Sequence, residues 1–271
     1  MPPAQDITDF YALIRDHWGE LTAFRAGART AMLNFGHWPE GTASLHEAQQ
    51  AFLARITDAL PAAATAARGL EIGCGIGGIS LGVLQRLPQA RLVGLDISPQ
   101  QLALARAHAD AGGVGARFDA VQADAMALPF ADGCFDFSLC IESSFHYPDK
   151  ARFVAETART LRPGGRLVLA DITCDDVSRV QFRQGNFFDS PAHYLGWLEA
   201  AGLRVVHAED LGPHVYGPLL QHVRAHNETR RSRVGRYWSL VLANYEQLQR
   251  EGAMGYWLFV VDRPEAPARR A

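Results

Sequence analysis

The stretch 70–80 reads Leu70-Glu71-Ile72-Gly73-Cys74-Gly75-Ile76-Gly77-Gly78-Ile79-Ser80. It decides the fold, because an apolar run ends in an acidic residue and a glycine-rich turn before the pattern becomes helical. Glycine has no Cβ, so its backbone adopts positive φ angles and approaches a ligand closely. Open α/β sheets hold nucleotide-like ligands at such strand–turn–helix units. Gly73, Gly75 and Gly78 also satisfy the G-x-G-x-x-G pattern of dinucleotide-binding proteins, so the spacing alone leaves two ligand classes open.

Strands and helices alternate in the residues that follow. This alternation predicts an α/β fold with a Rossmann-like, seven-stranded and mostly parallel sheet covered by helices on both faces. The expected strands are 68–72, 91–95, 116–121, 134–140, 166–172, 203–209 and 256–261. The expected helices are 77–87, 98–110, 149–161 and one that begins at Ser190-Pro191, followed by two more within about 213–250.

The pattern also divides the chain. Residues 1–66 predict a helical N-terminal lid, which ends in the alanine-rich segment before the first strand. Residues 67–262 form the expected core, with cap elements at about 174–197 and 211–250, and 263–271 is a tail.

Acidic residues recur where predicted strands end. Glu71 precedes the glycine turn, Asp96 closes the second strand and Asp124 follows the third. Because ligands of open parallel sheets bind outside the carboxyl ends of the strands, these acids are expected at one site. A carboxylate after the second strand suits two ribose hydroxyls, and one after the third suits an adenine amino group. Glu71 suits a cationic amino-acid portion.

This combination resembles the class I S-adenosylmethionine-dependent methyltransferases. Glu71-x-Gly73-x-Gly75-x-Gly77 is similar to the first motif of that family. The runs Leu128–Asp136 and Leu161–Leu167 are similar to its approaches to the fourth and fifth strands. A dinucleotide dehydrogenase would explain the glycines and Asp96, but neither Glu71 nor the two later runs. The resemblance therefore implies S-adenosylmethionine as cofactor.

The resemblance also implies which residues hold that cofactor. They are Glu71, Gly73, Cys74, Gly75, Gly77, Asp96, Ile97, Gln101, Asp124, Ala125 and Ile141. The segment Asn34-Phe35-Gly36-His37-Trp38 resembles the Leu-Gly-Tyr-Trp-type segment of small-molecule methyltransferases, with His where Tyr is commoner. Those enzymes include natural-product sugar O-, sarcosine-type N- and tocopherol-type C-methyltransferases. By this resemblance Phe35, Trp38 and Tyr11 close the cofactor site.

The candidate catalytic residues follow the fourth and fifth strands. The Glu142-Ser143…His146-x-Pro148-Asp149 pattern resembles natural-product sugar O-methyltransferases, in which a histidine at this place is the general base. His146 is therefore the expected base, and imidazole suits that task near neutral pH. Asp171 resembles their second acidic site residue, and His37 is a secondary candidate. A structural role for His146, as a helix cap or filler, remains the alternative.

The predicted activity is methyl transfer to oxygen or nitrogen of a small-molecule, secondary-metabolite acceptor. One alternative is C-methylation of a prenyl or quinone-like acceptor, in which Glu142 would steady a carbocation. A second is a protein that binds the cofactor but acts as a cyclase or a non-methylating module.

The composition limits the partners. The 271 residues carry a net charge of −3, so we expect neither nucleic acid nor membrane to be recruited by a global field. The start lacks a signal-peptide pattern and the four cysteines show no C-x-x-C pairing, which indicates a reducing cytoplasm. His222 and His226 have a metal-chelating spacing but no evident third ligand, so no metal is predicted. The oligomeric state stays open, with a homodimer as one alternative.

Overall fold

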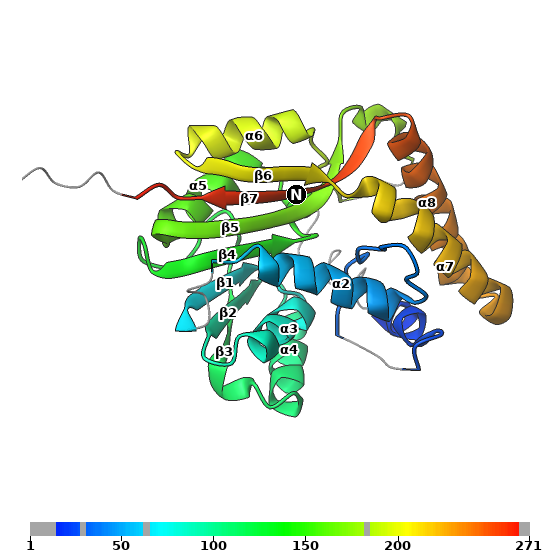
Figure 1. Cartoon of the computed structure of the whole chain (residues 1–271), viewed down its shortest axis with the longest axis horizontal. Coiled ribbons are helices and arrows are strands. Elements are labelled where there is room, and N and C mark those ends of the chain that lie inside the picture. Colours follow the sequence, from blue (N-terminus) through cyan, green and yellow to red (C-terminus); the bar gives the residue numbers. More distant parts are fainter. Residues whose placement is uncertain (1–14, 28–30, 62–65, 182–184, 266–271) are drawn as a thin grey trace, which may run out of the picture.

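A computed structural model describes residues 15–27, 31–61, 66–181 and 185–265. Seven strands form one sheet in the order β3-β2-β1-β4-β5-β7-β6 (Figure 1). The pairs from β3 to β5 are parallel, whereas β7 runs antiparallel to both β5 and β6. The strands are β1 Arg68–Ile72, β2 Arg91–Asp96, β3 Phe118–Gln122, β4 Phe135–Ile141, β5 Leu161–Cys174, β6 Arg204–Asp210 and β7 Met254–Asp262. The predicted fold class is therefore confirmed.

Helices cover both faces of the sheet (Figure 1). They are α2 Leu45–Asp58, α3 Gly78–Arg86, α4 Pro99–Ala111, α5 Lys150–Thr160, α6 Pro191–Ala200, α7 Tyr216–Arg230 and α8 Arg233–Arg250. Side chains cap the helix starts in the expected way: the Ser98 hydroxyl accepts from Gln101 N, and the Ser190 hydroxyl accepts from His193 N. Proline follows both caps, where its missing N–H costs no helical hydrogen bond.

Three predicted strands have boundaries that are wrong by two residues or more. The third strand begins at Phe118 rather than 116, because Gly115–Arg117 form a 3-10 turn that leads into it. The seventh begins at Met254 rather than 256. The fifth is twice as long as expected, since it begins at Leu161, which pairs with Phe135, and its ladder with β7 continues through Thr173 and Cys174. Asp171 therefore lies inside a strand and not at its end.

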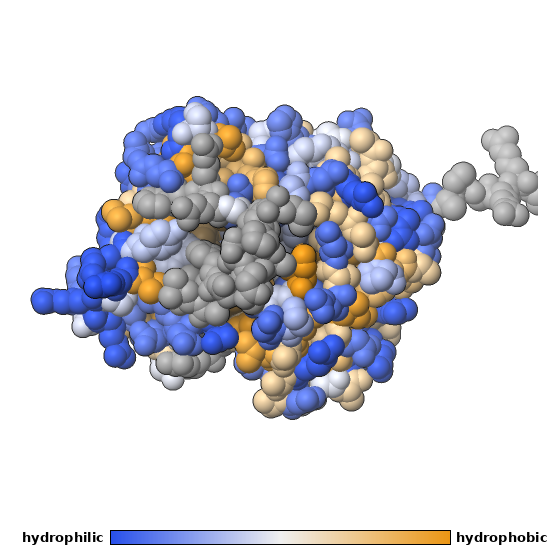
Figure 2. Space-filling model, turned by 180° about the vertical axis from the view of Figure 1, so that it is seen from behind, coloured by the Kyte–Doolittle hydropathy of each residue, from blue (hydrophilic) through white to orange (hydrophobic). Residues whose placement is uncertain are grey.

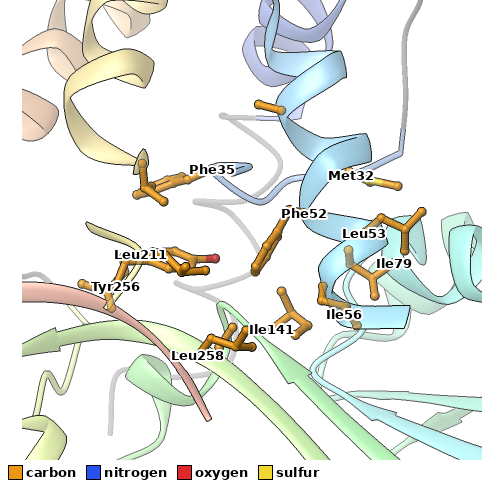
Figure 3. Packing of buried hydrophobic residues seen from close by; sticks show 14 of the residues in the cluster. Met32, Phe35, Phe52, Leu53, Ile56, Ile79, Ile141, Leu211, Tyr256 and Leu258 are labelled. Atoms are coloured by element: carbon orange, nitrogen blue, oxygen red, sulfur yellow. The ribbon is translucent and has the colours of Figure 1, made fainter. Parts of the chain in front are cut away.

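One hydrophobic cluster joins the N-terminal segment to the sheet. Phe52 and Ile56 of α2 lie toward Ile141 of β4, whereas Leu53 lies beside Met32 and Ile79 of α3 (Figure 3). The same cluster includes Trp18, Met32 and residues of α3, α4, α7 and α8, while a second cluster on the opposite face includes α5 and α6. The segment before β1 is thus packed against one face of the core.

The surface shows small apolar areas. On the face drawn in Figure 2, hydrophobic residues are interrupted by hydrophilic ones wherever the atoms are not grey. The large hydrophobic side chains with most exposure in the described ranges are Val177, Leu195, Val206, Tyr237 and Leu240. Within the described residues, each helix is too short or too polar to cross a bilayer.

Candidate active site

A cavity lies at the carboxyl ends of β1 to β4. Its walls come from the glycine turn, the ends of β2 and β3, the loop after β4 and the segment before α2. The predicted cofactor residues that line it are Glu71, Gly73, Cys74, Gly75, Asp96, Ile97, Gln101, Asp124, Ala125 and Ile141. The topology explains this meeting, because the carboxyl ends of parallel strands share one edge of the sheet.

Close contacts around the glycine turn require glycine at two positions. Gly73 has a φ of 73°, and a Cβ there would lie 1.8 Å from the Ser143 hydroxyl oxygen. At Gly78 a Cβ would lie 2.4 Å from the Ala31 carbonyl oxygen, so the segment before α2 sits directly on the start of α3. Gly77 is not among the lining residues; it has a φ of 84° and packs against Ala105. Gly77 therefore contributes the left-handed backbone that the turn needs, and not a contact with the cavity.

Asp96 ties the turn to the next strand. Its carboxylate accepts from Gly75 N and from Ser98 N, both at 2.9 Å. Burial raises its pKa. Because both bonds come from backbone N–H groups, the carboxylate is held rigidly at the cavity wall, where its remaining acceptor capacity can serve ligand hydroxyls.

Glu71 is buried behind the glycine turn. Its carboxyl group accepts from the Ser80 hydroxyl on α3. Burial raises its pKa to about 8. A neutral carboxyl at pH 7 would regain its charge beside a cation, so Glu71 is poised for a positively charged ligand.

The segment before α2 forms a lid over the cavity. Gln49 Nε2 donates to the carbonyl oxygens of Met32 at 3.1 Å and Asn34 at 2.9 Å, which fixes the path of the segment. Met32, Leu33 and Asn34 line the cavity. The Asn34 Nδ2 is a buried donor without a partner in the described part of the chain. A ligand with acceptor atoms at this wall would satisfy it.

Two of the three aromatic residues predicted to close the cofactor site lie behind the cavity wall. The described residues that line the cavity include neither Phe35 nor Trp38. Both are buried, and the Trp38 indole donates to the Phe35 carbonyl oxygen at 3.0 Å. Their rings support the lid from behind. Tyr11 lies outside the described residues, so its role stays a prediction.

Glu142 and His146 line the cavity on the side of the loop after β4. Glu142 has a φ of 48°, unusual for a residue with a side chain. Its Oε1 accepts from Phe35 N at 2.7 Å and from the Tyr256 hydroxyl at 2.6 Å, so it joins the lid to β7. Burial raises its pKa to about 8. The strained backbone aims this carboxyl group at the lid and the cavity.

His146 sits on the short turn Ser144–His146. Its Nδ1 lies 3.4 Å from the Gly185 carbonyl oxygen, and its ring packs on Phe145. Burial lowers its pKa to about 4. The imidazole is therefore neutral at physiological pH, which is the form that accepts a proton.

Asp171 does not line the cavity. It is fully buried and accepts from the Ser144 hydroxyl and from Phe145 N at 2.9 Å. Burial raises its pKa to about 6. Asp171 therefore holds the turn that carries His146, and it does so through Ser144 and Phe145.

His37 also lies away from the cavity lining. Its ring contacts His214 with 5.6 Å between centroids, and burial lowers its pKa to about 4. Because it faces the region of α2 and the turn before α7, direct action on a ligand in this cavity would require a rearrangement.

Sequence reasoning missed several lining residues. Around the glycine turn and the ends of β2 and β3 they are Ile76, Gly78, Ile79, Leu95, Ala123 and Met126, and after β4 they are Ser143, Tyr147 and Pro148. The Ser143 and Tyr147 hydroxyls lie 2.6 Å apart, next to Gly73. Their spacing of four around a turn, directly after the strand beside β1, is the signal that would have indicated them.

The two spaced histidines of α7 are packed among aromatic rings. His222 Nε2 lies 3.0 Å from the Leu21 carbonyl oxygen, and His226 contacts Phe24 with 5.2 Å between centroids. In the described part of the chain, no group of three or more His, Cys, Asp or Glu side chains is arranged to hold a metal ion.

The strand order and the site together define a class. A sheet with the order 3-2-1-4-5-7-6 and an antiparallel seventh strand, a glycine turn after β1, and acids at the ends of β1, β2 and β3 is the arrangement of class I methyltransferases.

Comparison with known proteins supports this class. Residues 70–169 match the family profile described as a methyltransferase domain. Methyltransferase GfsG of Streptomyces halstedii is 34% identical over 210 residues, which cover 73% of this chain and 75% of that protein. The 27-O-demethylrifamycin SV methyltransferase of Amycolatopsis mediterranei is 28% identical over 280 residues, 94% of each chain. Among solved structures, the [4+2]-cyclase SpnF matches with a TM-score of 0.79 and 23% identity, covering 98% of this chain and 97% of the other.

The chain belongs to the class I S-adenosylmethionine-dependent methyltransferases. The cavity fits S-adenosylmethionine: Gly73 and Gly78 leave no room for a Cβ, and Asn34 offers an unpartnered amide donor. Asp96, Asp124 and Glu71 are the residues that would hold its polar groups. The bound cofactor supplies an electrophilic methyl group on a positively charged sulfur.

Cofactor binding should depend on pH. In the free protein at pH 7, Glu71 and Glu142 are mostly protonated, because the pKa of each is raised to about 8. The bound ligand carries two cations, the ammonium of its amino-acid portion and the sulfonium, and both favour the charged carboxylates and so release protons. We therefore expect the affinity for S-adenosylmethionine to rise from about pH 6 to about pH 8 and then level off. Calorimetry in two buffers of different ionisation enthalpy counts the protons released.

S-adenosylhomocysteine is the control for this prediction, because its sulfur is uncharged. Its affinity should change less over the same pH range. Equal pH slopes for the two ligands would show that the sulfonium charge is not what Glu71 and Glu142 sense.

Proposed function

We propose that this protein transfers a methyl group from S-adenosylmethionine to a hydroxyl oxygen, or to nitrogen, of a small-molecule natural-product acceptor. The observation that carries the proposal is the position of His146, which lines the same cavity as Gly73 and Asp96. A neutral imidazole beside the donor site is suited to take the proton that a hydroxyl nucleophile loses. The relative named as a 27-O-demethylrifamycin SV methyltransferase supports a natural-product acceptor.

In this proposal the protein acts mainly by orienting the methyl donor and the acceptor relative to each other. Methyl transfer is an in-line displacement, and well-oriented reactants can lower its barrier by roughly 7–11 kcal/mol. The lid residues 31–34 and the glycine turn exclude water from the donor, while His146 accepts the acceptor proton at Nε2. Asp171 acts at a distance: by holding Ser144 and Phe145, it keeps the His146 turn in place.

The low pKa of His146 has a cost and a benefit. At about 4 it makes the imidazole a weaker base than free histidine, but it keeps nearly every molecule in the accepting form at pH 7. Acceptor hydroxyls of low pKa, such as phenols, suit such a base better than alkanols do.

Incubation with methyl-labelled S-adenosylmethionine and a panel of acceptors tests the proposed function. The panel should contain phenols, sugar hydroxyls, amines and prenylated quinols. We expect label on oxygen or nitrogen of one of these classes. Tight cofactor binding with no label on any acceptor would contradict the proposal and favour a non-methylating protein. One protein of similar fold, SpnF, is described as a [4+2]-cyclase.

A second candidate function rests on Glu142. Its carboxyl group lines the cavity, so C-methylation would use it to steady a carbocation at a prenyl or quinone-like acceptor. Label on carbon instead of oxygen would select this alternative. We further propose a cytoplasmic location and no nucleic-acid or membrane partner, in line with the net charge of −3.

A further inference from the structure

Lys150 is the only lysine in this chain, which carries 26 lysine and arginine residues in total. It is also buried: its side chain is 1% exposed, at the first position of α5. Buried lysines are rare unless they are paired, because burial penalises the charged ammonium group. Specific contacts of the ammonium group must therefore offset the free energy lost on its desolvation.

The Lys150 ammonium makes three such contacts. It donates to the Phe187 carbonyl oxygen, it donates to the Tyr147 carbonyl oxygen at 3.2 Å, and it lies 3.1 Å from the Asp189 carboxylate. Three acceptors use all three N–H groups of one ammonium. The contacts join two segments far apart in sequence, namely the turn after β4 and residues 185–189 before α6.

Residues 185–189 in turn hold His146. The Gly185 carbonyl oxygen lies 3.4 Å from His146 Nδ1, and the Asn186 side chain also bonds the ring. Phe187 N donates to the Phe145 carbonyl oxygen at 2.6 Å. A carbonyl oxygen accepts only, so it selects the tautomer in which Nδ1 carries the hydrogen. Nε2 then keeps the lone pair that a base needs.

We propose that Lys150 is a positioning residue for catalysis: by clamping residues 185–189 onto the turn after β4, it fixes the His146 tautomer and orientation. The proposal rests on His146 being the base. Arginine, which the chain uses at its other cationic positions, would not substitute, because its planar fork is larger and spreads its donors differently from a compact ammonium. The positive charge of Lys150 also helps to keep the pKa of His146 low.

Lys150→Met tests the proposal, since methionine keeps the length and loses the charge and donors. Histidine-selective ¹⁵N labelling reports the His146 tautomer through long-range correlations, with the signal assigned from a His146→Asn variant. We expect wild type to show hydrogen on Nδ1 and Lys150→Met to show mixed tautomers. The Phe187 amide should exchange with solvent at least about ten-fold faster, because its bond to Phe145 loses support.

Turnover adds a second readout. With any acceptor that accepts label, kcat should fall at least about ten-fold while the affinity for S-adenosylhomocysteine stays within about two-fold. The matched control is Arg152→Met in the same first turn of α5, where an exposed guanidinium donates to the Met126 carbonyl oxygen. It should leave the His146 signal unchanged.

An unchanged His146 tautomer and an unchanged Phe187 exchange rate in Lys150→Met would overturn the proposal. If that variant does not fold, Asp189→Asn weakens the same clamp at its half-buried carboxylate and is read in the same way. Because the spectroscopic readout needs no acceptor, it stands apart from the proposed function. If Lys150→Met changes the His146 tautomer and the Phe187 exchange rate but His146→Ala keeps full turnover, the clamp stands and His146 is not the base.

Discussion

His146→Ala should lower the turnover number by about 10²–10⁴-fold, the usual contribution of a general base. The cofactor affinity should stay nearly unchanged, since Nδ1 of His146 contacts the Gly185 carbonyl oxygen on the acceptor side. Steady-state kinetics with labelled S-adenosylmethionine gives the first quantity, and calorimetry with S-adenosylhomocysteine gives the second. Unchanged turnover would remove His146 from the mechanism.

His37→Ala is the matched control. Both histidines are partly buried with pKa values of about 4, but only His146 lines the cavity. His37→Ala should therefore lose little turnover. If both variants lost the same activity, the effect would reflect general damage to the fold and not the removal of a base.

Gly73→Ala should destabilise the protein and abolish cofactor binding together. An alanine Cβ would lie 1.8 Å from the Ser143 hydroxyl oxygen and 2.5 Å from its Cβ, at a φ of 73°. Overpacking and a left-handed backbone together cost about 2–5 kcal/mol. The melting temperature should fall by roughly 5–20 °C, and thermal unfolding with and without S-adenosylhomocysteine measures both effects.

Gly75→Ala separates the effect of the left-handed backbone from the effect of overpacking. Gly75 has a φ of 54°, but the nearest atom to its Cβ would be Gln101 Oε1 at an ordinary 3.7 Å. This variant should lose only the backbone part of the stability, about 1–2 kcal/mol. Equal losses for Gly73→Ala and Gly75→Ala would show that the contact with Ser143 does not matter.

Much of the donor side could be predicted because it depends on local patterns. A strand, a glycine turn and a helix lie within the stretch 70–80, and acids at strand ends meet when the strands are parallel. Strand order is not a local property. The antiparallel position of β7 between β5 and β6 was not predicted, because nothing in the spacing of the strands along the chain indicates it.

The acceptor side could be predicted less well, because its contacts join distant parts of the chain. Asp171 was expected at a strand end, but the ladder with β7 continues past it and turns its carboxylate toward Ser144. The lid has no periodicity, so nothing indicated that Asn34 would face the cavity while Phe35 and Trp38 pack behind it. Lys150 and Asp189 are 39 positions apart, and only folding brings them within 3.1 Å.

The strand order has an evolutionary consequence. Donor residues come from β1, β2 and β3, whereas His146, Asp171 and the clamp around Lys150 come from β4, β5 and the segments that follow them. Mutations on the second side that leave Glu142 and Ser143 unchanged would not disturb the first, because Ser143 packs directly on Gly73. A sheet of this kind can therefore take a new acceptor and keep its donor site intact.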